Sequence, residues 1–340
     1  MMKEFDLRGF DMSYIEDTAP EKQQYYWVGL YYFLAKAAID ACGETGERVI
    51  RKSVRAFGRA RGRRMRQISN ARGLPANLTT LFDNYDLMSD PRFVHPQEGR
   101  VVTAQVKKSI TGRCPDAEMW RRMPDGLHIG SLYCEEVHHQ IYGGFDPAVQ
   151  VNLCETLTNG GDQCRFHIYC RPSNQCEYPL PPYIPQSWED FEGDMVASIH
   201  SIFCLLYLHM AGPILQELGQ AVLVDGLEQF CQYRGIRTRA LNLRDGLPLN
   251  AENFLLHGDL FLDHRFGLSV EKTAGGTVAR TSRNILREVC ESYGYPELEA
   301  LYSAVSYPAL LKGYNQDLHC ELAKPTESTP IKLLISTNVI

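Results

Sequence analysis

The chain lacks the features that most simply direct a protein into or across a membrane. Its first residues, "MMKEFDLRGFDMSYIED", carry charges where a signal peptide has an apolar core. Asp, Glu, Lys and Arg are absent over residues 196–216, but this stretch contains two histidines and a Gly-Pro pair, and no second stretch resembles it. We therefore expect a buried core helix there, in a cytoplasmic protein that has no membrane partner.

Neither sign of charge predominates. With 35 basic and 41 acidic residues the net charge is -6, which excludes a general attraction to nucleic acid or anionic lipid. One local run at residues 51–66, "RKSVRAFGRARGRRMR", places arginines 51, 55, 59 and 63 on one helical stripe. A nucleic-acid face would look similar, but aromatic interleaving is missing. We interpret the stripe as a solvated helix face and expect no nucleic-acid partner.

The cysteines do not form a compact metal motif. There are 11 of them, none in a Cys-x-x-Cys pair, and without an export signal they are expected to be free thiols. Three of them, Cys114, Cys134 and Cys164, could bind zinc together with a histidine, so a zinc-thiolate enzyme stays open as an alternative. Their long spacing favours a protein that needs neither a metal nor another cofactor.

The sequence contains a long internal repeat. Residues 61–93 align with 234–266 without a gap and share 13 of 33 residues, against about two expected from ordinary composition. The shared residues include a Gly-Leu-Pro turn and three arginines, Arg61, Arg64 and Arg66 in the first copy, which would brace the helix or bind a carboxylate. Further on, residues 132–169 align more weakly with 301–337. These alignments predict a tandem duplication.

Both copies predict the same fold. Each reads as an apolar helix, a second helix that ends at the Gly-Leu-Pro turn, and then a mixture of helices and strands. A proline-rich stretch separates them, because its prolines cannot continue a helix or a central strand. We therefore predict an α+β protein of two tandem helical-plus-antiparallel-sheet domains, 1–170 and 191–340, joined by a linker at 171–190. The halves should pack about a pseudo-two-fold axis, and homo-oligomer formation stays open.

The second copy has lost several polar side chains of the first. The alignment places Cys134 opposite Ser303, Glu155 opposite Lys324, Asp162 opposite Ile331 and Cys164 opposite Leu333, and it gives Cys114 no cysteine partner. A residue that the fold requires should persist in both copies, whereas a residue required for a reaction can disappear from the half that does not perform it. This indicates one site, in the first half, and a degenerate second copy. Drift at tolerant positions is the alternative.

Cys134 is the preferred nucleophile. If "YCEEVHHQIY" is helical, His138 lies one turn further on the same face and could take or return a proton, although a buried thiol beside a surface histidine would give the same pattern. The segment "ETLTNGGDQCRF" reads as a hairpin with Glu155 and Cys164 on adjacent strands and Asp162 near the turn. The two carboxylates could orient a base or bind a substrate nitrogen, or Asp162 could only close the turn.

These residues resemble a known family. The elements are Cys114-Pro115, Tyr133-Cys134, Phe145-Asp146-Pro147 and a final Gly161-Asp162 followed by Cys164 and Phe166. They are similar to recurring features of the L-2-amino-thiazoline-4-carboxylic acid hydrolase family, which is related to the four-vinyl-reductase type of ligand-binding domain. The close match covers about residues 20–170. The resemblance implies an α+β domain that hydrolyses a carbon–nitrogen bond in a cysteine-derived ring.

The expected function follows from the residues and this resemblance together. We expect a cysteine-dependent hydrolase that acts on a small cyclic amidine, thiazoline or related imine, in specialised biosynthesis. The candidate catalytic residues are Cys134, His138, Glu155, Asp162, Cys164 and Cys114, and the candidate substrate-binding residues are Arg64 and Tyr133. The tandem form departs from the usual single-domain form, so the family substrate need not carry over. A non-catalytic small-molecule-binding module is the alternative, since no recognised triad is present.

Overall fold

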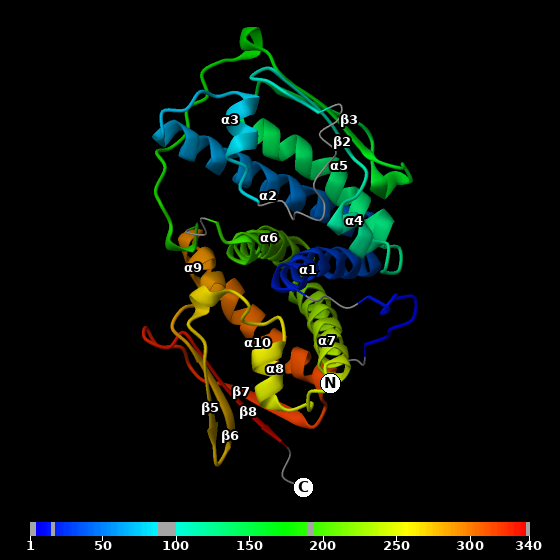
Figure 1. Ribbon diagram of the computed structural model, residues 1–340, viewed down its shortest axis with the longest axis vertical. Helices are drawn as coiled ribbons and strands as arrows, with labels where there is room; N and C mark the ends of the chain where they lie inside the picture. The colour runs from blue at the N-terminus through cyan, green and yellow to red at the C-terminus, as the bar shows by residue number, and fades with distance from the viewer. Residues whose placement is uncertain (1–4, 15–17, 88–99, 190–192, 338–340) are drawn as a thin grey trace.

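Two antiparallel sheets lie at opposite ends of the molecule, and helices fill the space between them (Figure 1). The computed structural model describes residues 5–14, 18–87, 100–189 and 193–337. The mixture of long helices with two four-stranded sheets confirms the predicted α+β class.

The first half combines five helices with the first sheet. Its strand order is β1-β2-β4-β3, and all neighbouring strands are antiparallel. The elements in chain order are α1 (Ala19–Cys42), α2 (Glu44–Ala71), α3 (Leu78–Asp83), β1 (Val101–Val102), β2 (Val106–Thr111), α4 (Pro115–Trp120), α5 (Gly126–Phe145), β3 (Val149–Glu155), the 3-10 turn η2 (Leu157–Asn159) and β4 (Cys164–Cys170).

The second half has the same succession of helices and strands. Its strand order, β5-β6-β8-β7, is equivalent to that of the first sheet. The elements are α6 (Met195–Glu217), α7 (Gln220–Arg244), α8 (Ala251–His257), the 3-10 turn η5 (His264–Phe266), β5 (Ser269–Thr273), β6 (Gly276–Thr281), α9 (Ile285–Ser292), α10 (Pro296–Tyr314), β7 (Leu318–Leu322) and β8 (Ile331–Thr337). The equal order supports the duplication, which itself stays a prediction.

Strand pairing corrects one part of the sequence alignment. In the first sheet Thr111 lies opposite Cys164, and in the second sheet Thr281 lies opposite Ile331. The structural counterpart of Cys164 is therefore Ile331, not Leu333. The alignment missed this because the segment from Leu153 to its partner Phe166 is two residues longer than the segment from Leu322 to its partner Leu333.

The first helix of each half lies between the two halves. Besides α2, helix α1 contacts α6 and α7 of the second half, and α6 contacts α2 of the first (Figure 1). Helix α6 contains the charge-free stretch 196–216. In the part of the chain that the structure describes, it is the one helix long and apolar enough to cross a membrane, and 78% of its apolar window is buried inside the protein. It packs as the predicted core helix.

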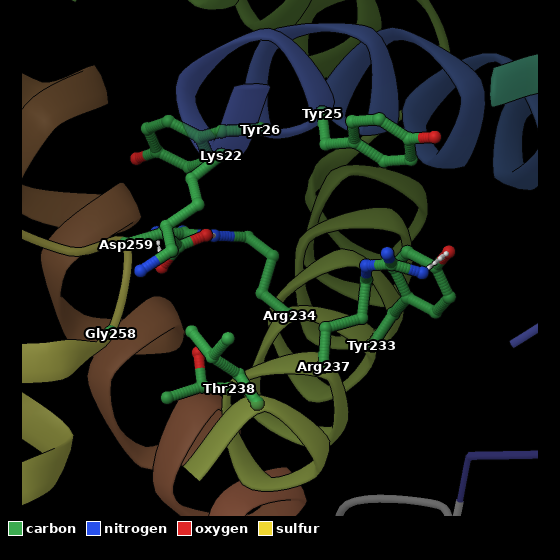
Figure 2. A pocket seen from close by; sticks show the side chains of 10 residues that line it. Lys22, Tyr25, Tyr26, Tyr233, Arg234, Arg237, Thr238, Gly258 and Asp259 are labelled. Atoms are coloured by element: carbon green, nitrogen blue, oxygen red, sulfur yellow. Dashed lines mark hydrogen bonds and ion pairs between the residues drawn. The ribbon is translucent and has the colours of Figure 1, made fainter. Parts of the chain in front are cut away.

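The repeated arginines form a buried ion pair in each half. The Arg61 guanidinium lies 2.6 Å from the Asp86 carboxylate, and that of Arg234 lies 2.8 Å from Asp259 (Figure 2). The two arginines are 2% and 3% exposed. A charge buried this deeply requires a partner. The need to pair each buried arginine explains why both copies have an arginine and an aspartate at these positions.

The glycine after each of these arginines allows two helices to approach closely. A Cβ atom on Gly62 would lie 2.0 Å from the carbonyl oxygen of Ile141, and one on Gly235 would lie 2.1 Å from that of Leu310. Helix α2 therefore packs directly on α5, and α7 packs in the same way on α10.

Candidate active site

Three of the predicted cysteines converge between α4, α5 and β4. Cys114 directly precedes α4, Cys134 lies on α5, and Cys164 is the first residue of β4. Burial raises the pKa of the Cys134 thiol above its ordinary value, the Thr158 hydroxyl opposes this shift, and the nearby Cys164 adds to it. Burial also raises the pKa of Cys114, and Asp116 and Cys134 add to that shift. The clustered thiols are therefore uncharged at neutral pH.

A carboxyl group that the sequence analysis did not select belongs to the same cluster. Asp116, in the first turn of α4, accepts a hydrogen bond from the side chain of Gln24 on α1. Burial raises the pKa of Asp116 to about 7, although Gln24 and Arg61 act in the opposite direction. A carboxyl group that titrates near neutral pH can accept a proton and return it. The Cys-Pro-Asp sequence that begins α4 was the available signal, since it places Asp116 within one turn of Cys114.

The second half has a small cavity at the equivalent place. The positions of Cys114, Asp116, Cys134 and Cys164 are occupied there by Asn284, Leu286, Ser303 and Ile331, all of which line a cavity of about 20 Å³. Asn284 precedes α9 as Cys114 precedes α4, which supplies the counterpart that the alignment did not find. The cluster of three thiols and Asp116 is therefore specific to the first half.

His138 lies on the same helix as Cys134, but no hydrogen bond joins the two side chains among the described residues. Its ring centroid is 5.0 Å from that of Phe166 and 6.1 Å from that of Tyr142. Burial, with Lys107 nearby, lowers the pKa of His138 to about 3. An imidazole with this pKa is neutral at physiological pH and is a weak base. Its predicted role as proton acceptor for Cys134 therefore stays a prediction without support from a direct contact.

The two predicted carboxylates lie at the turn of the β3–β4 hairpin. Glu155 accepts hydrogen bonds from the backbone N–H of Asp162 and from the side chain of Gln163, each at 3.2 Å, and it lies 3.6 Å from the guanidinium of Arg165. The Asp162 side chain is exposed. These contacts favour the structural alternative, in which Glu155 and Asp162 stabilise the turn. Glu155 is still close enough to Cys164 to contribute to the raised pKa of that thiol.

The two residues predicted to bind substrate lie in different places. Tyr133 is 4% exposed and packs in the core beside the thiol cluster, with its ring centroid 5.8 Å from that of Trp27 and 5.0 Å from that of Tyr31. Its pKa is raised by burial, and Asp116 is among the charges that act on it. Arg64 instead lines a cavity beside the linker, which the three cysteines do not line.

The thiol cluster does not have the arrangement of a metal centre. Within the described ranges, no group of three or more His, Cys, Asp or Glu side chains is positioned to hold a metal ion. The zinc-thiolate alternative therefore has no support in the geometry of these residues.

The arginine stripe of α2 lies against α5. Arg51 is 2.8 Å from the Glu135 carboxylate and Arg55 is 2.6 Å from that of Glu136, while Arg59 donates to the side-chain oxygen of Gln140. The interpretation as a solvated face was incomplete, since intramolecular partners take up much of its charge.

Comparison with known proteins gives a match to the first half. Residues 23–168 match the family model described as L-2-amino-thiazoline-4-carboxylic acid hydrolase, and this range contains the three clustered cysteines and Asp116. No curated protein and no solved structure matches the chain significantly. The match agrees with the motifs that begin α4 and β4. The resemblance of residues 23–168 to the L-2-amino-thiazoline-4-carboxylic acid hydrolase family is therefore confirmed.

Proposed function

We propose that the first half is a cysteine-dependent hydrolase that cleaves a carbon–nitrogen bond in a small cyclic amidine such as a thiazoline. The family name describes hydrolysis of an amino-thiazoline. The observation that carries the proposal is the half-buried Asp116, whose raised pKa places a titrating carboxyl group beside the Cys114 and Cys134 thiols. A carboxylate in this position suits a cationic amidinium group, whose two N–H donors can bind both of its oxygens.

Cys134 supplies the nucleophile in this proposal. Its proton passes to the Asp116 carboxylate while the sulfur bonds to the amidine carbon, and the electrons of the C=N bond move to nitrogen. Asp116 then returns the proton to the leaving nitrogen and the C–N bond breaks, which leaves the carbon on sulfur. One water molecule adds to that carbon, and the sulfur departs as a thiol. The net reaction consumes one water.

Cys164 acts as a positioning residue in the same proposal. Its sulfur accepts a hydrogen bond from the backbone N–H of Leu157 at 3.4 Å. Leu157 begins η2, and the next residue of this turn, Thr158, carries the hydroxyl that lowers the pKa of Cys134. Cys164 thereby supports a group that stabilises the Cys134 thiolate.

A non-catalytic binding module is the second candidate, and the raised thiol pKa values favour it. A thiol with a raised pKa is a poor nucleophile until a base or a cationic ligand stabilises its thiolate. Iodoacetamide labelling followed by mass spectrometry separates the candidates. The hydrolase predicts that an amidine substrate changes the labelling rate of Cys134 selectively, because the bound cation lowers its pKa or covers it. Uniform slow labelling of all buried thiols, with or without the amidine, would favour the binding module.

The direct test replaces Cys134 by serine. With 2-amino-thiazoline-4-carboxylate as substrate, we expect Cys134→Ser to lower the rate by at least about 10³-fold, because a hydroxyl is a far weaker nucleophile at this pH. The measurement is the loss of the C=N chromophore, with circular dichroism to show that the variant folds. Ser303→Ala, at the equivalent position of the second half, is the matched control and should keep full activity. Full activity in Cys134→Ser, or a larger loss in Ser303→Ala, would place the reaction elsewhere.

A further inference from the structure

Two cavities occupy equivalent places between the halves. Each lies between the second helix of one half and the first helix of the other. The second-half cavity is lined by Tyr25 and Tyr26 of α1, by α7 residues that include Arg234 and Arg237, and by Asp259. The first-half cavity is lined by α2 residues Arg61, Arg64, Met65, Ile68, Ala71 and Arg72, by residues 84–86 and the linker, and by α6 residues Ser201, Ile202 and Leu205.

Two tyrosines of α1 largely fill the second-half cavity. Figure 2 shows Tyr26 over Arg234 and Tyr25 beside Arg237. The guanidinium carbon of Arg234 is 3.6 Å from the centroid of the Tyr26 ring, and that of Arg237 is 4.9 Å from the Tyr25 ring. The Tyr26 hydroxyl lies 2.5 Å from that of Tyr302. The remaining volume is about 30 Å³.

Among the described residues, no side chain of α6 fills the first-half cavity in this way. Counted from the start of each helix, Ser201 and Ile202 of α6 hold the places of Tyr25 and Tyr26 of α1. Their side chains are shorter and carry no ring. The volume of this cavity is about 500 Å³, which lies within the range of small-molecule sites in proteins.

The charged side chains that line the first-half cavity carry an excess of positive charge. Arg61 pairs with Asp86, and Arg64 pairs with Glu189. Arg72 is exposed, and its guanidinium donates a 3.4 Å hydrogen bond to the side-chain oxygen of Asn84. No carboxylate pairs with it among the described residues.

Arg64 offers a further unused donor in this cavity. Its guanidinium carbon lies 5.0 Å from the Tyr183 ring centroid and 5.2 Å from that of Trp188, both of the linker. Its Nη2 atom is buried and has no hydrogen-bond partner within the part of the chain that the structure describes. These two ring contacts restrain the position of the guanidinium, and its planar array of N–H donors suits a carboxylate.

We infer that this cavity is a binding site for a small aromatic carboxylate. The ring would take the place that Tyr26 fills in the other half, against Ile202 and Ile68, and the carboxylate would bind Arg64 and Arg72. Cys114, Asp116 and Cys134 do not line the cavity, so the site is separate from the proposed hydrolase site and does not depend on its function.

The probe for this site is 4-hydroxybenzoate, which combines a phenol ring with a carboxylate. Equilibrium dialysis with the full chain should detect saturable binding of one molecule. Ile202→Tyr, which restores the ring of the other half, should abolish it. Ala71→Trp, at an exposed position that lines the cavity, should lower the affinity as well and does not change the core. Unchanged affinity in a folded Ile202→Tyr or Ala71→Trp protein, or no saturable binding to the wild type, would overturn the inference.

A charge-specific comparison tests the carboxylate. Arg72→Gln should weaken binding of 4-hydroxybenzoate on the order of tenfold, the effect of one charge-assisted hydrogen bond. Arg59→Gln is the matched control, because Arg59 lies on the same helix and bonds to Gln140 of α5, outside the cavity. It should leave binding unchanged. Equal weakening in both variants would show that only the general charge of α2 attracts the probe, and would overturn the inference.

Discussion

Asp116 is the single residue on which the chemistry of the candidate site depends most. This half-buried carboxyl group, with a pKa of about 7, is half ionised under physiological conditions. Ionising Asp116 in this environment costs free energy, so the folded protein loses stability as the pH rises. A bound amidinium cation would offset this cost. A ligand of opposite charge is therefore the one that our proposal expects at this site.

Replacing Asp116 by asparagine should stabilise the protein at alkaline pH. The pKa in the fold is raised above the unfolded value of 3.8, so its contribution to stability is complete below about pH 4 and is lost as the pH rises through about 7. Asp116→Asn should increase the free energy of unfolding at pH 8, by up to about 4 kcal/mol at about 1.4 kcal/mol per pKa unit. Urea unfolding at pH 4 and pH 8 measures this. An equal effect at both pH values would contradict the raised pKa.

The residues of the site were only partly predictable from the sequence. Cys134 and Cys164 emerged because the aligned second copy carries other residues there. Asp116 did not, since it follows a change in the alignment offset, and its counterpart Leu286 becomes apparent only when α4 and α9 are matched. Whether His138 contacts Cys134 depends on rotamers and packing, which one-turn spacing on a helix does not determine.

Among the secondary-structure elements, α2 and α5 show how a single position sets a helix contact. Gly62 of α2 lies against the backbone of α5, with the Ile141 carbonyl oxygen 2.0 Å from where a Cβ would be. The close approach also holds the arginines of α2 within reach of the carboxylates of α5. Helix spacing and charge pairing thus depend on each other in the first half.

The variant Gly62→Ala should destabilise the protein in spite of the better helix propensity of alanine. Separating the two backbones costs about 1–3 kcal/mol, as other overpacked substitutions do. Gly143→Ala, on α5, is the control, because no atom lies within 4 Å of its added Cβ, and it should stabilise by about 0.5–1 kcal/mol. Thermal unfolding of both variants gives the comparison. Destabilisation of similar size in the two would refute the role of close packing at Gly62.

The elements themselves followed from the sequence pattern better than their arrangement did. The predicted hairpin around Asp162 joins β3 and β4, and the charge-free stretch lies inside α6. The cross-packing of α1 on α7 and of α6 on α2 was not predicted. Both α1 and α6 carry apolar residues around most of their circumference. Their sequence pattern therefore does not predict which helix packs against which face.

Across the whole molecule, three histidines with lowered pKa values link stability to pH. Burial lowers the pKa of His138 to about 3 and those of His200 and His209 to about 4. His209 of α6 lies between the halves, with its ring centroid 6.5 Å from that of Phe57 and 5.7 Å from that of Tyr293. Because His209 is neutral in the folded protein, its protonation in acid should weaken the contact between the halves.

The substitution His209→Phe should reduce this sensitivity to acid. The stability contributed by neutral His209 is complete above its unfolded pKa of 6.5 and is lost as the pH falls toward about 4. At pH 5 the wild type has lost about 2 kcal/mol through this residue. The difference in unfolding free energy between His209→Phe and the wild type should therefore grow by that amount from pH 8 to pH 5. Parallel pH profiles of the two proteins would contradict a buried neutral histidine.

Helix α1 takes part in the interior of both halves, since Gln24 binds Asp116 and Tyr26 lies on Arg234. In a pair of identical subunits, one inherited substitution would alter two equivalent sites at once. Here each site is encoded by its own codons. Selection can therefore keep Cys134 in one half while Ser303 occupies the equivalent position of the other. A substitution in one half does not impose the same substitution on the other half. The covalent joining of the halves makes every residue of the shared interface independently variable.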